Sequence, residues 1–217
     1  MVRSLLKTTK YFKVFSMSLV PMVLENENGR ERSFDLFSRM LRDRIVFCNG
    51  VVEDNMANLI VAQLLYLESV DPKADIHMYI NSPGGQVTSG MAIFDTMNFI
   101  TPDVVTIVNG QSCSMGSFLS TAGAKGKRVA MSNARIMIHQ PSSGIARSTV
   151  TDMIIQMEET KEMKRRLTQY YADHTGQTYE KMHDLMERDC FMSPEAAKEL
   201  GLIDHVVGKR SEIGDLW

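Results

Sequence analysis

The chain has 217 residues, of which 44% are hydrophobic and 23% are charged. This composition favours a single globular domain and excludes a disordered or fibrous protein. A formal net charge of -2 gives no support for a nucleic-acid partner, and no apolar run reaches the roughly 20 residues of a membrane span. The three cysteines, Cys48, Cys113 and Cys190, are odd in number and form no CxxC pair. They favour a reducing compartment over a secreted protein.

The first 24 residues carry four basic side chains and no acidic one. The apolar stretch from Phe15 to Leu24 is broken by two serines and a proline, so it lacks the continuous core of a secretory signal. We expect residues 1–18 to form a removable propeptide or a mobile arm, with an organellar presequence as the alternative, and residues 19–217 to form one domain. A cytoplasmic location is expected, with the mitochondrial matrix or a plastid as the alternative.

The first predicted elements are two helices separated by a strand. Helical spacing begins at Ser33, a possible N-cap, and ends before a β-type run at 45–47. Asp54 can cap a second helix, which stops before Asp71-Pro72. The apolar positions of this second helix recur at intervals of three and four: Leu59, Ile60, Leu64, Leu65 and Leu67.

Two strand-turn-helix units follow. In the first, a strand at 76–80 enters the turn Asn81-Ser82-Pro83-Gly84-Gly85 and then a helix through 91–97. The second unit repeats this order over 104–122. Repeated units of this kind predict an α/β fold with a largely parallel sheet.

The rest of the chain is predicted to hold two short strands and two helices. The strands are at 129–131 and 136–138, and the long helix runs from about 149 to 173. The closing helix starts at Ser193-Pro194-Glu195 and stops at Gly201. Apolar and aromatic residues cover more than one side of the long helix, so we expect another subunit to bury several of them: Val150, Met153, Ile154, Met157, Leu167, Tyr170 and Tyr171.

A candidate nucleophile lies in the second unit. Ser112-x-Ser114-x-Gly116 follows a strand and opens a helix, the setting in which a sharp turn exposes a serine hydroxyl for attack. The match to G-x-S-x-G is partial, because its first position is Ser. A serine that only caps the helix is the alternative.

A serine hydroxyl needs a base that titrates near neutral pH and a carboxylate that orients this base. Of the five histidines, only His139 ends an apolar strand and precedes a turn. A strand-end histidine bonded to backbone is the alternative. Asp189 lies in a short link before the closing helix, where its carboxylate could point into a cleft, whereas Asp184 and Glu187 are expected to face water.

Gly84-Gly85 can supply backbone N–H groups for a developing oxyanion, because a chain without Cβ atoms can approach a ligand closely. The alternative is an ordinary turn after Pro83.

Together these features resemble the ClpP family, the proteolytic subunits of Clp proteases, from about Leu19 to Val207. Six segments, in order along the chain, carry the resemblance: Leu19-Val20-Pro21-Met22-Val23, Glu31-Arg32-Ser33-Phe34-Asp35, Tyr79-Ile80-Asn81-Ser82-Pro83-Gly84-Gly85, Ser114-Met115-Gly116, Met137-Ile138-His139-Gln140-Pro141 and Glu187-Arg188-Asp189.

The resemblance implies a serine endopeptidase of crotonase-like fold. It assigns Ser114 as nucleophile, His139 as general base and Asp189 as orienting acid, with the N–H groups of Gly85 and Met115 as the oxyanion hole. It also implies two stacked seven-membered rings around a chamber in which unfolded polypeptides are cleaved. No cofactor is expected in this subunit, because the partner unfoldase uses the ATP.

The resemblance further implies a docking surface for a Clp-type AAA+ unfoldase at Tyr79, Phe99 and Ile107. Asn109 departs from the family pattern there, because an apolar residue is expected at its position. The helix at 149–173 resembles the handle that joins the two rings.

Two other functions remain open at this point. A hydratase or isomerase of the crotonase fold uses similar N–H pairs, but it would leave Ser114 and His139 without a purpose. A ring subunit that only scaffolds an active paralogue is the other alternative.

Overall fold

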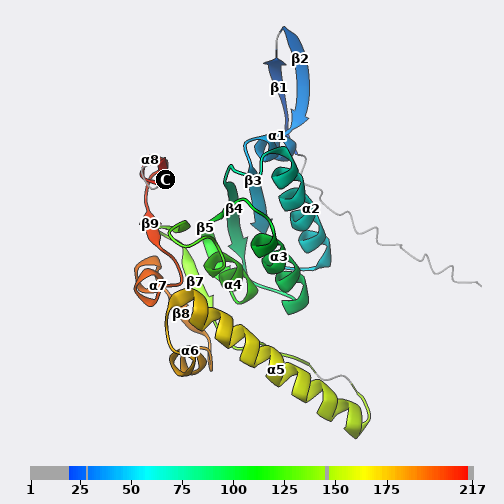
Figure 1. The fold of residues 1–217 in the computed structure, drawn as a ribbon, viewed down its shortest axis with the longest axis vertical. Coiled ribbons are helices and arrows are strands. Elements are labelled where there is room, and N and C mark those ends of the chain that lie inside the picture. Colours follow the sequence, from blue (N-terminus) through cyan, green and yellow to red (C-terminus); the bar gives the residue numbers. More distant parts are fainter. Residues whose placement is uncertain (1–19, 28, 145–146, 215–217) are drawn as a thin grey trace, which may run out of the picture. The chain divides into compact units, whose positions relative to one another are not determined.

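The computed structural model describes residues 20–27, 29–144 and 147–214 (Figure 1). The chain divides into two compact units, one up to Arg39 and the other from Met40. The expected propeptide or arm, residues 1–18, lies outside the described residues.

The first unit contains an antiparallel hairpin of β1 (Met22–Glu27) and β2 (Arg30–Asp35). Gly29 adopts a φ of 78°, a conformation that favours glycine, and its N–H donates to Asn26 Oδ1 at 2.9 Å. The turn therefore fixes the register in which Met22 lies opposite Asp35.

The helix expected from Ser33 begins later in the structure. Ser33 pairs with Leu24 within β2, and α1 (Leu36–Arg42) follows the strand. Asp35 accepts the Ser38 N–H at 3.0 Å, which is the capping bond that had been expected of Ser33. The prediction was wrong because strand pairing decides the conformation of Ser33 and Phe34, and helical spacing alone does not reveal a strand partner.

The second unit holds the remaining elements. In chain order they are β3 (Ile45–Asn49), α2 (Asp54–Val70), β4 (Ile76–Ser82), α3 (Val87–Phe99), β5 (Val104–Cys113), α4 (Met115–Thr121), β6 (Arg128–Met131), β7 (Arg135–Ile138), α5 (Val150–Thr175), α6 (Tyr179–Leu185), β8 (Cys190–Met192), α7 (Pro194–Leu200), β9 (His205–Val207) and α8 (Arg210–Gly214). Glu53 is the N-cap residue of α2 and Asp54 its first helical residue, so the helix begins one position earlier than expected.

The sheet of the second unit is parallel along the order β3-β4-β5-β6-β9. Strand β5 has two partners: Thr106–Val108 pair with β6, and Gln111–Cys113 pair with β7. β8 then adds to β7 in the antiparallel direction. The predicted α/β fold with a largely parallel sheet is confirmed, and it agrees with a crotonase-like fold.

The core lies on one face of this sheet. Side chains alternate across a strand, so Val104 and Val108 of β5 belong to the large cluster formed with α2, α3 and α4, whereas Val105 and Ile107 belong to a separate small cluster. The strongest apolar packing therefore holds the helices that follow β4 and β5, the two strands that lead to Gly84 and Ser114.

The long helix α5 is capped at both ends. Thr149 Oγ1 accepts the Asp152 N–H at 3.3 Å, and Gly176 ends the helix with a φ of 70°. Its second half is buried at Leu167 and Tyr171, but its first half leaves large apolar side chains exposed, with Val150 at 74%. In Figure 1 this first half projects away from the sheet of the second unit.

A buried ion pair joins β6 to the segment before β9. Arg128 donates to Asp204 from Nε at 2.8 Å and from Nη2 at 2.6 Å, and the Arg128 and Gly126 N–H groups also donate to this carboxylate. Burial raises the pKa of Asp204, but the hydrogen bonds from Arg128 and from the two backbone N–H groups outweigh it, so the pKa is lowered overall from 3.8.

Asp204→Asn should lower the free energy of unfolding by about 2 kcal/mol at pH 7, because Arg128 then lacks its counter-charge. The expected loss is smaller than for a fully buried ion pair, since the Asp204 side chain is 17% exposed. The folded-state pKa lies below the unfolded one. The stabilisation is therefore present above the unfolded value and is lost as the pH falls through the folded value, so the difference between the proteins should shrink below about pH 4. Urea denaturation at several pH values measures this.

The control is Glu158→Gln, which removes an exposed pair with Lys161 and should change stability little. Equal destabilisation by the two variants would contradict a special role for the buried pair.

Candidate active site

Ser114 lies in a strained turn between β5 and α4. Its φ of 53° and ψ of -123° fall in a region that residues other than glycine rarely adopt. The turn is held by the Ser114 N–H, which donates to Met137 O at 2.9 Å, and by the Ser114 carbonyl, which accepts from Phe118 N at 3.0 Å and from Ser117 Oγ at 2.7 Å. Backbone strain held in this way is common at functional sites, and here it fixes the position of a serine hydroxyl.

His139 leaves β7 directly beside this serine. Cys113 and Met137 are partners in the β5–β7 pairing, so the parallel strands end together and the residues that follow come close. His139 Nε2 lies 2.9 Å from Ser114 Oγ. A neutral imidazole with its proton on Nδ1 can therefore accept the serine proton at Nε2.

Asp189 faces the other nitrogen of the same imidazole. β7 and β8 are antiparallel with Ile138 opposite Cys190, so the flanking residues His139 and Asp189 also face each other. His139 Nδ1 lies 2.9 Å from Asp189 Oδ1. The structure thus brings the three predicted residues together in one hydrogen-bonded chain.

Gln140 ties the two segments of this chain to each other. Its N–H donates to Met186 O at 2.6 Å and its Nε2 donates to Glu187 O at 2.9 Å. Both acceptors lie within three residues of Asp189, so Gln140 holds the acid segment next to His139. The side chain of Asp189 is nevertheless 60% exposed and that of His139 25%.

Gly84 lies against the Ser114 turn, and Gly85, the next residue, lies against the backbone of Val52. Their φ angles are 96° and 158°. A Cβ on Gly84 would be 2.6 Å from Ser114 Cβ, and one on Gly85 would be 2.1 Å from Val52 O, so no side chain fits at either position. Within the described residues, neither the Gly85 nor the Met115 N–H has a hydrogen-bond acceptor, which leaves both donors available to a ligand.

A buried tyrosine supports the serine turn from α5. Tyr171 is 4% exposed; its hydroxyl lies 2.6 Å from Ser117 Oγ and 3.4 Å from the Ser114 carbonyl oxygen. Burial raises the pKa of Tyr171, so the hydroxyl stays protonated and can donate. The sequence pattern placed Tyr171 among the residues of the long helix expected to be buried by another subunit, and it indicated no role for Ser117 or Gln140. The adjacency of Gln140 to His139 was a usable signal, whereas a helical tyrosine gives no sign of a contact with Ser117 of the same chain.

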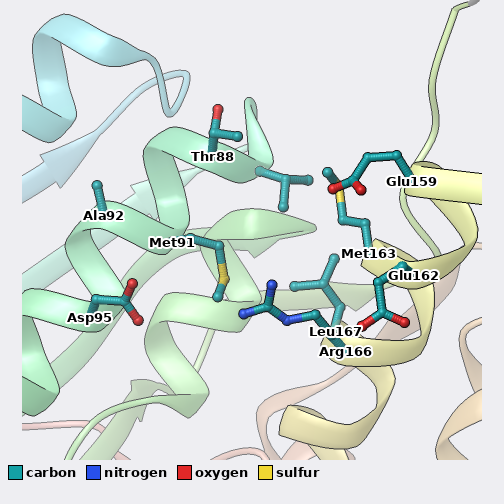
Figure 2. Close-up of a pocket in the computed structure, with 10 residues that line it drawn as sticks. Thr88, Met91, Ala92, Asp95, Glu159, Glu162, Met163, Arg166 and Leu167 are labelled. Carbon is teal, nitrogen blue, oxygen red and sulfur yellow. The ribbon is translucent and has the colours of Figure 1, made fainter. Parts of the chain in front are cut away.

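A cavity of about 400 Å³ opens between α3 and α5 (Figure 2). Apolar side chains line it with charged ones among them, and Figure 2 shows Arg166 extending from α5 toward α3. Val87 follows Gly85 by two residues, and Leu167 is one helical turn before Tyr171, so the cavity adjoins the elements that position Ser114. Its lining residues are Val87, Thr88, Met91, Ala92, Asp95, Glu159, Glu162, Met163, Arg166 and Leu167.

The three residues expected at a docking surface do not all lie together. Tyr79 is half-buried and packs with the buried Ile107 in the small cluster on the second face of the sheet. Phe99 is the last residue of α3, is 80% exposed and does not belong to that cluster.

Residues 20–27, 29–144 and 147–214 contain no group of His, Cys, Asp or Glu side chains able to hold a metal ion. In the same part of the chain, no helix has the length and apolarity to cross a membrane.

Gly84→Ala should abolish the reaction of Ser114 with a fluorophosphonate probe, because the added methyl group collides with Ser114 Cβ. Gly176→Ala is the matched control: its φ of 70° imposes a similar backbone cost, but nothing lies within 4 Å of its Cβ. Each variant should lose about 1 kcal/mol of stability from positive φ. Only Gly84→Ala should lose labelling, measured by intact mass, and normal labelling of that variant would contradict the close approach.

One comparison with known proteins bears on this arrangement. A family model described as Clp protease matches residues 28–210, which is most of the chain and includes every residue of the hydrogen-bonded chain described above. The resemblance noted in the sequence is thereby confirmed. The chain therefore belongs to the Clp protease family, whose members are serine proteases that assemble as oligomers and work with Clp unfoldases.

Proposed function

We propose that this protein is a serine endopeptidase subunit in which Ser114 is the nucleophile, His139 the general base and Asp189 the orienting acid. The observation that carries the proposal is the pair of 2.9 Å contacts that join Ser114 Oγ, His139 and Asp189 Oδ1. A histidine that only bonded to backbone would not face a hydroxyl on one nitrogen and a carboxylate on the other.

The proposed peptide cleavage has two steps, acylation of Ser114 and hydrolysis of the acyl-serine. His139 Nε2 takes the proton of Ser114 as Oγ attacks the substrate carbonyl carbon, and the N–H groups of Gly85 and Met115 stabilise the oxyanion. His139 then gives the proton to the leaving amine as the C–N bond breaks. Water attacks the resulting acyl-serine, with His139 again taking and returning one proton. Asp189 stabilises the imidazolium cation in both steps.

This chemistry needs no cofactor from the subunit, because Ser114 supplies the attacking oxygen atom and His139 moves the protons. The thiol of Cys113, next to the serine, does not compete. Burial raises the pKa of Cys113, and the charge of Asp189 raises it further against the opposing effect of Arg135, so the thiol stays protonated near neutral pH.

Assembly is part of the proposal, in the form of two stacked heptameric rings. The large apolar residues on the first half of α5, Val150, Met153, Ile154, Ile155 and Met157, are between 36% and 74% exposed and suit burial by a second subunit. A carboxylate that is 60% exposed also holds its imidazole weakly. Exclusion of water by a neighbouring subunit would strengthen the contact between Asp189 and His139, which links assembly to activity.

The proposed substrates are unfolded polypeptides delivered by a Clp-type AAA+ unfoldase. The sequence contains no G-x-x-x-x-G-K-[ST] motif with which to use ATP, so unfolding has to come from a partner. The proposed docking surface contains Tyr79 and Ile107, with Phe99 supplied by a neighbouring subunit. Within the described residues, Asn109 Oδ1 is buried without a hydrogen-bond donor.

Ser114→Ala should abolish cleavage of a short fluorogenic peptide and labelling by a fluorophosphonate, while native mass shows unchanged assembly. Loss of a triad residue can lower kcat by about a million-fold, and a methyl group at this position keeps the packing. Ser69→Ala, at an exposed position of α2, is the matched control and should retain full activity. A purified Ser114→Ala protein that kept a tenth of the wild-type rate would exclude Ser114 as nucleophile. Unlabelled but assembled wild-type protein would favour a scaffold role.

A stably folded substrate should resist the isolated protein and should be degraded once an unfoldase and ATP are present. Opening a stable domain costs roughly 5–15 kcal/mol, which the isolated protein has no means to supply. Gel analysis of a folded fluorescent protein and of its unfolded form gives the comparison. Rapid degradation of the folded form without ATP would show that the site is open to folded proteins.

A further inference from the structure

The second face of the sheet carries a small apolar cluster away from the main core. Val105 and Ile107 of β5, Val129 of β6 and Val207 of β9 are each at most 5% exposed, and Tyr79 of β4 packs against them. Parallel sheets are normally covered on both faces. The helices α2, α3 and α4 pack on the other face, so this cluster needs a different cover.

The cover in this structure is the C-terminal helix α8. Ile213 of α8 packs against the cluster. Glu212 shapes the turn that brings it there, because its Oε2 accepts the N–H groups of Gly208 at 2.8 Å and Lys209 at 3.3 Å. In Figure 1, α8 lies just beyond the end of β9, the strand that contributes Val207.

This cover is small and incomplete. α8 has five residues, too few to form a stable helix alone, and Ile213 is its one apolar side chain. Ser211 and Glu212 are exposed, and a cavity of about 370 Å³ remains, lined by Tyr79, Met131 and Val207 as well as Ile213. A single aliphatic anchor over a partly filled cavity is a contact that can open.

We infer that the segment 208–214 is a reversible intramolecular cap, which competes with the Clp unfoldase for the surface formed by Tyr79, Ile107, Val129 and Val207. The inference rests on the proposed docking function of Tyr79 and Ile107. Because Ile213 already packs on this surface, the surface accepts an aliphatic side chain presented by a short turn. The partner is therefore a protein loop with such a residue, and it binds only when α8 has moved away.

The expected size of the effect follows from the fraction of molecules that are open. The apparent dissociation constant of a partner equals the intrinsic value divided by that fraction, so a cap closed in about nine molecules of ten weakens binding about tenfold. A short linker gives an effective concentration of about 1 mM, so such a cap needs an intrinsic dissociation constant near 0.1 mM.

The test uses the assembled full-length protein and a fluorescein-labelled synthetic peptide of residues 208–217, followed by fluorescence anisotropy up to about 2 mM protein, a range set by that effective concentration. Ile213→Asp removes the apolar anchor. Ser211→Asp introduces the same charge at an exposed position of the same helix and is the matched control. The peptide should bind Ile213→Asp about tenfold more tightly than wild type or Ser211→Asp. Adding Met131→Lys to Ile213→Asp should weaken binding, because Met131 lines the cavity.

Equal binding to the three proteins, or no binding to Ile213→Asp over this range, would overturn the cap. Cleavage of a short fluorogenic peptide by the same wild-type preparation separates this result from the proposed function. Absence of Ser114-dependent cleavage would count against the peptidase and leave the binding result unaffected. Normal cleavage with equal peptide binding would count against the cap alone.

Discussion

The divided pairing of β5 is the constraint on which the rest of the site depends. Its first half belongs to the sheet with β6, and its last three residues pair with β7 instead. Because of this second pairing, β5 and β7 end side by side. The antiparallel pairing of β8 with β7 then places Asp189 opposite His139. Three residues separated by up to 75 positions in sequence meet because two short pairings fix their register.

Glycine and backbone strain fix the position of the Ser114 hydroxyl. Ser114 is held at positive φ, and Gly84 approaches it too closely to carry a side chain, while Gly85 is equally crowded by Val52. Within the described residues, the Gly85 and Met115 N–H groups on either side of this contact have no hydrogen-bond acceptor. A similar serine in an ordinary helix cap would use its oxygen atom to satisfy the helix and could not offer it to a substrate.

Much of this could be predicted from the sequence, because parallel βα units have strong local signals. The strands before Gly84 and Ser114 and the ends of α5 and α7 were predicted close to their observed positions. The three residues selected from the sequence, Ser114, His139 and Asp189, lie within hydrogen-bonding distance of one another in the structure. The start of α1 was wrong because β1 pairs with the residues before it, and pairing partners are not visible in spacing. Tyr171 and Gln140 were missed because their roles arise only from tertiary contacts with Ser114 and the segment before Asp189.

The helix α5 connects a row of exposed apolar side chains to the turn that contains Ser114. Its 26 residues extend about 39 Å at 1.5 Å per residue, with exposed apolar residues near one end and Tyr171, which contacts the Ser114 turn, near the other. A continuous helix is stiff along its axis. A displacement of the exposed first half of α5 is therefore transmitted to the turn that holds Ser114. A subunit that packed on the exposed half of α5, as proposed above, would therefore also affect the position of the Ser114 hydroxyl.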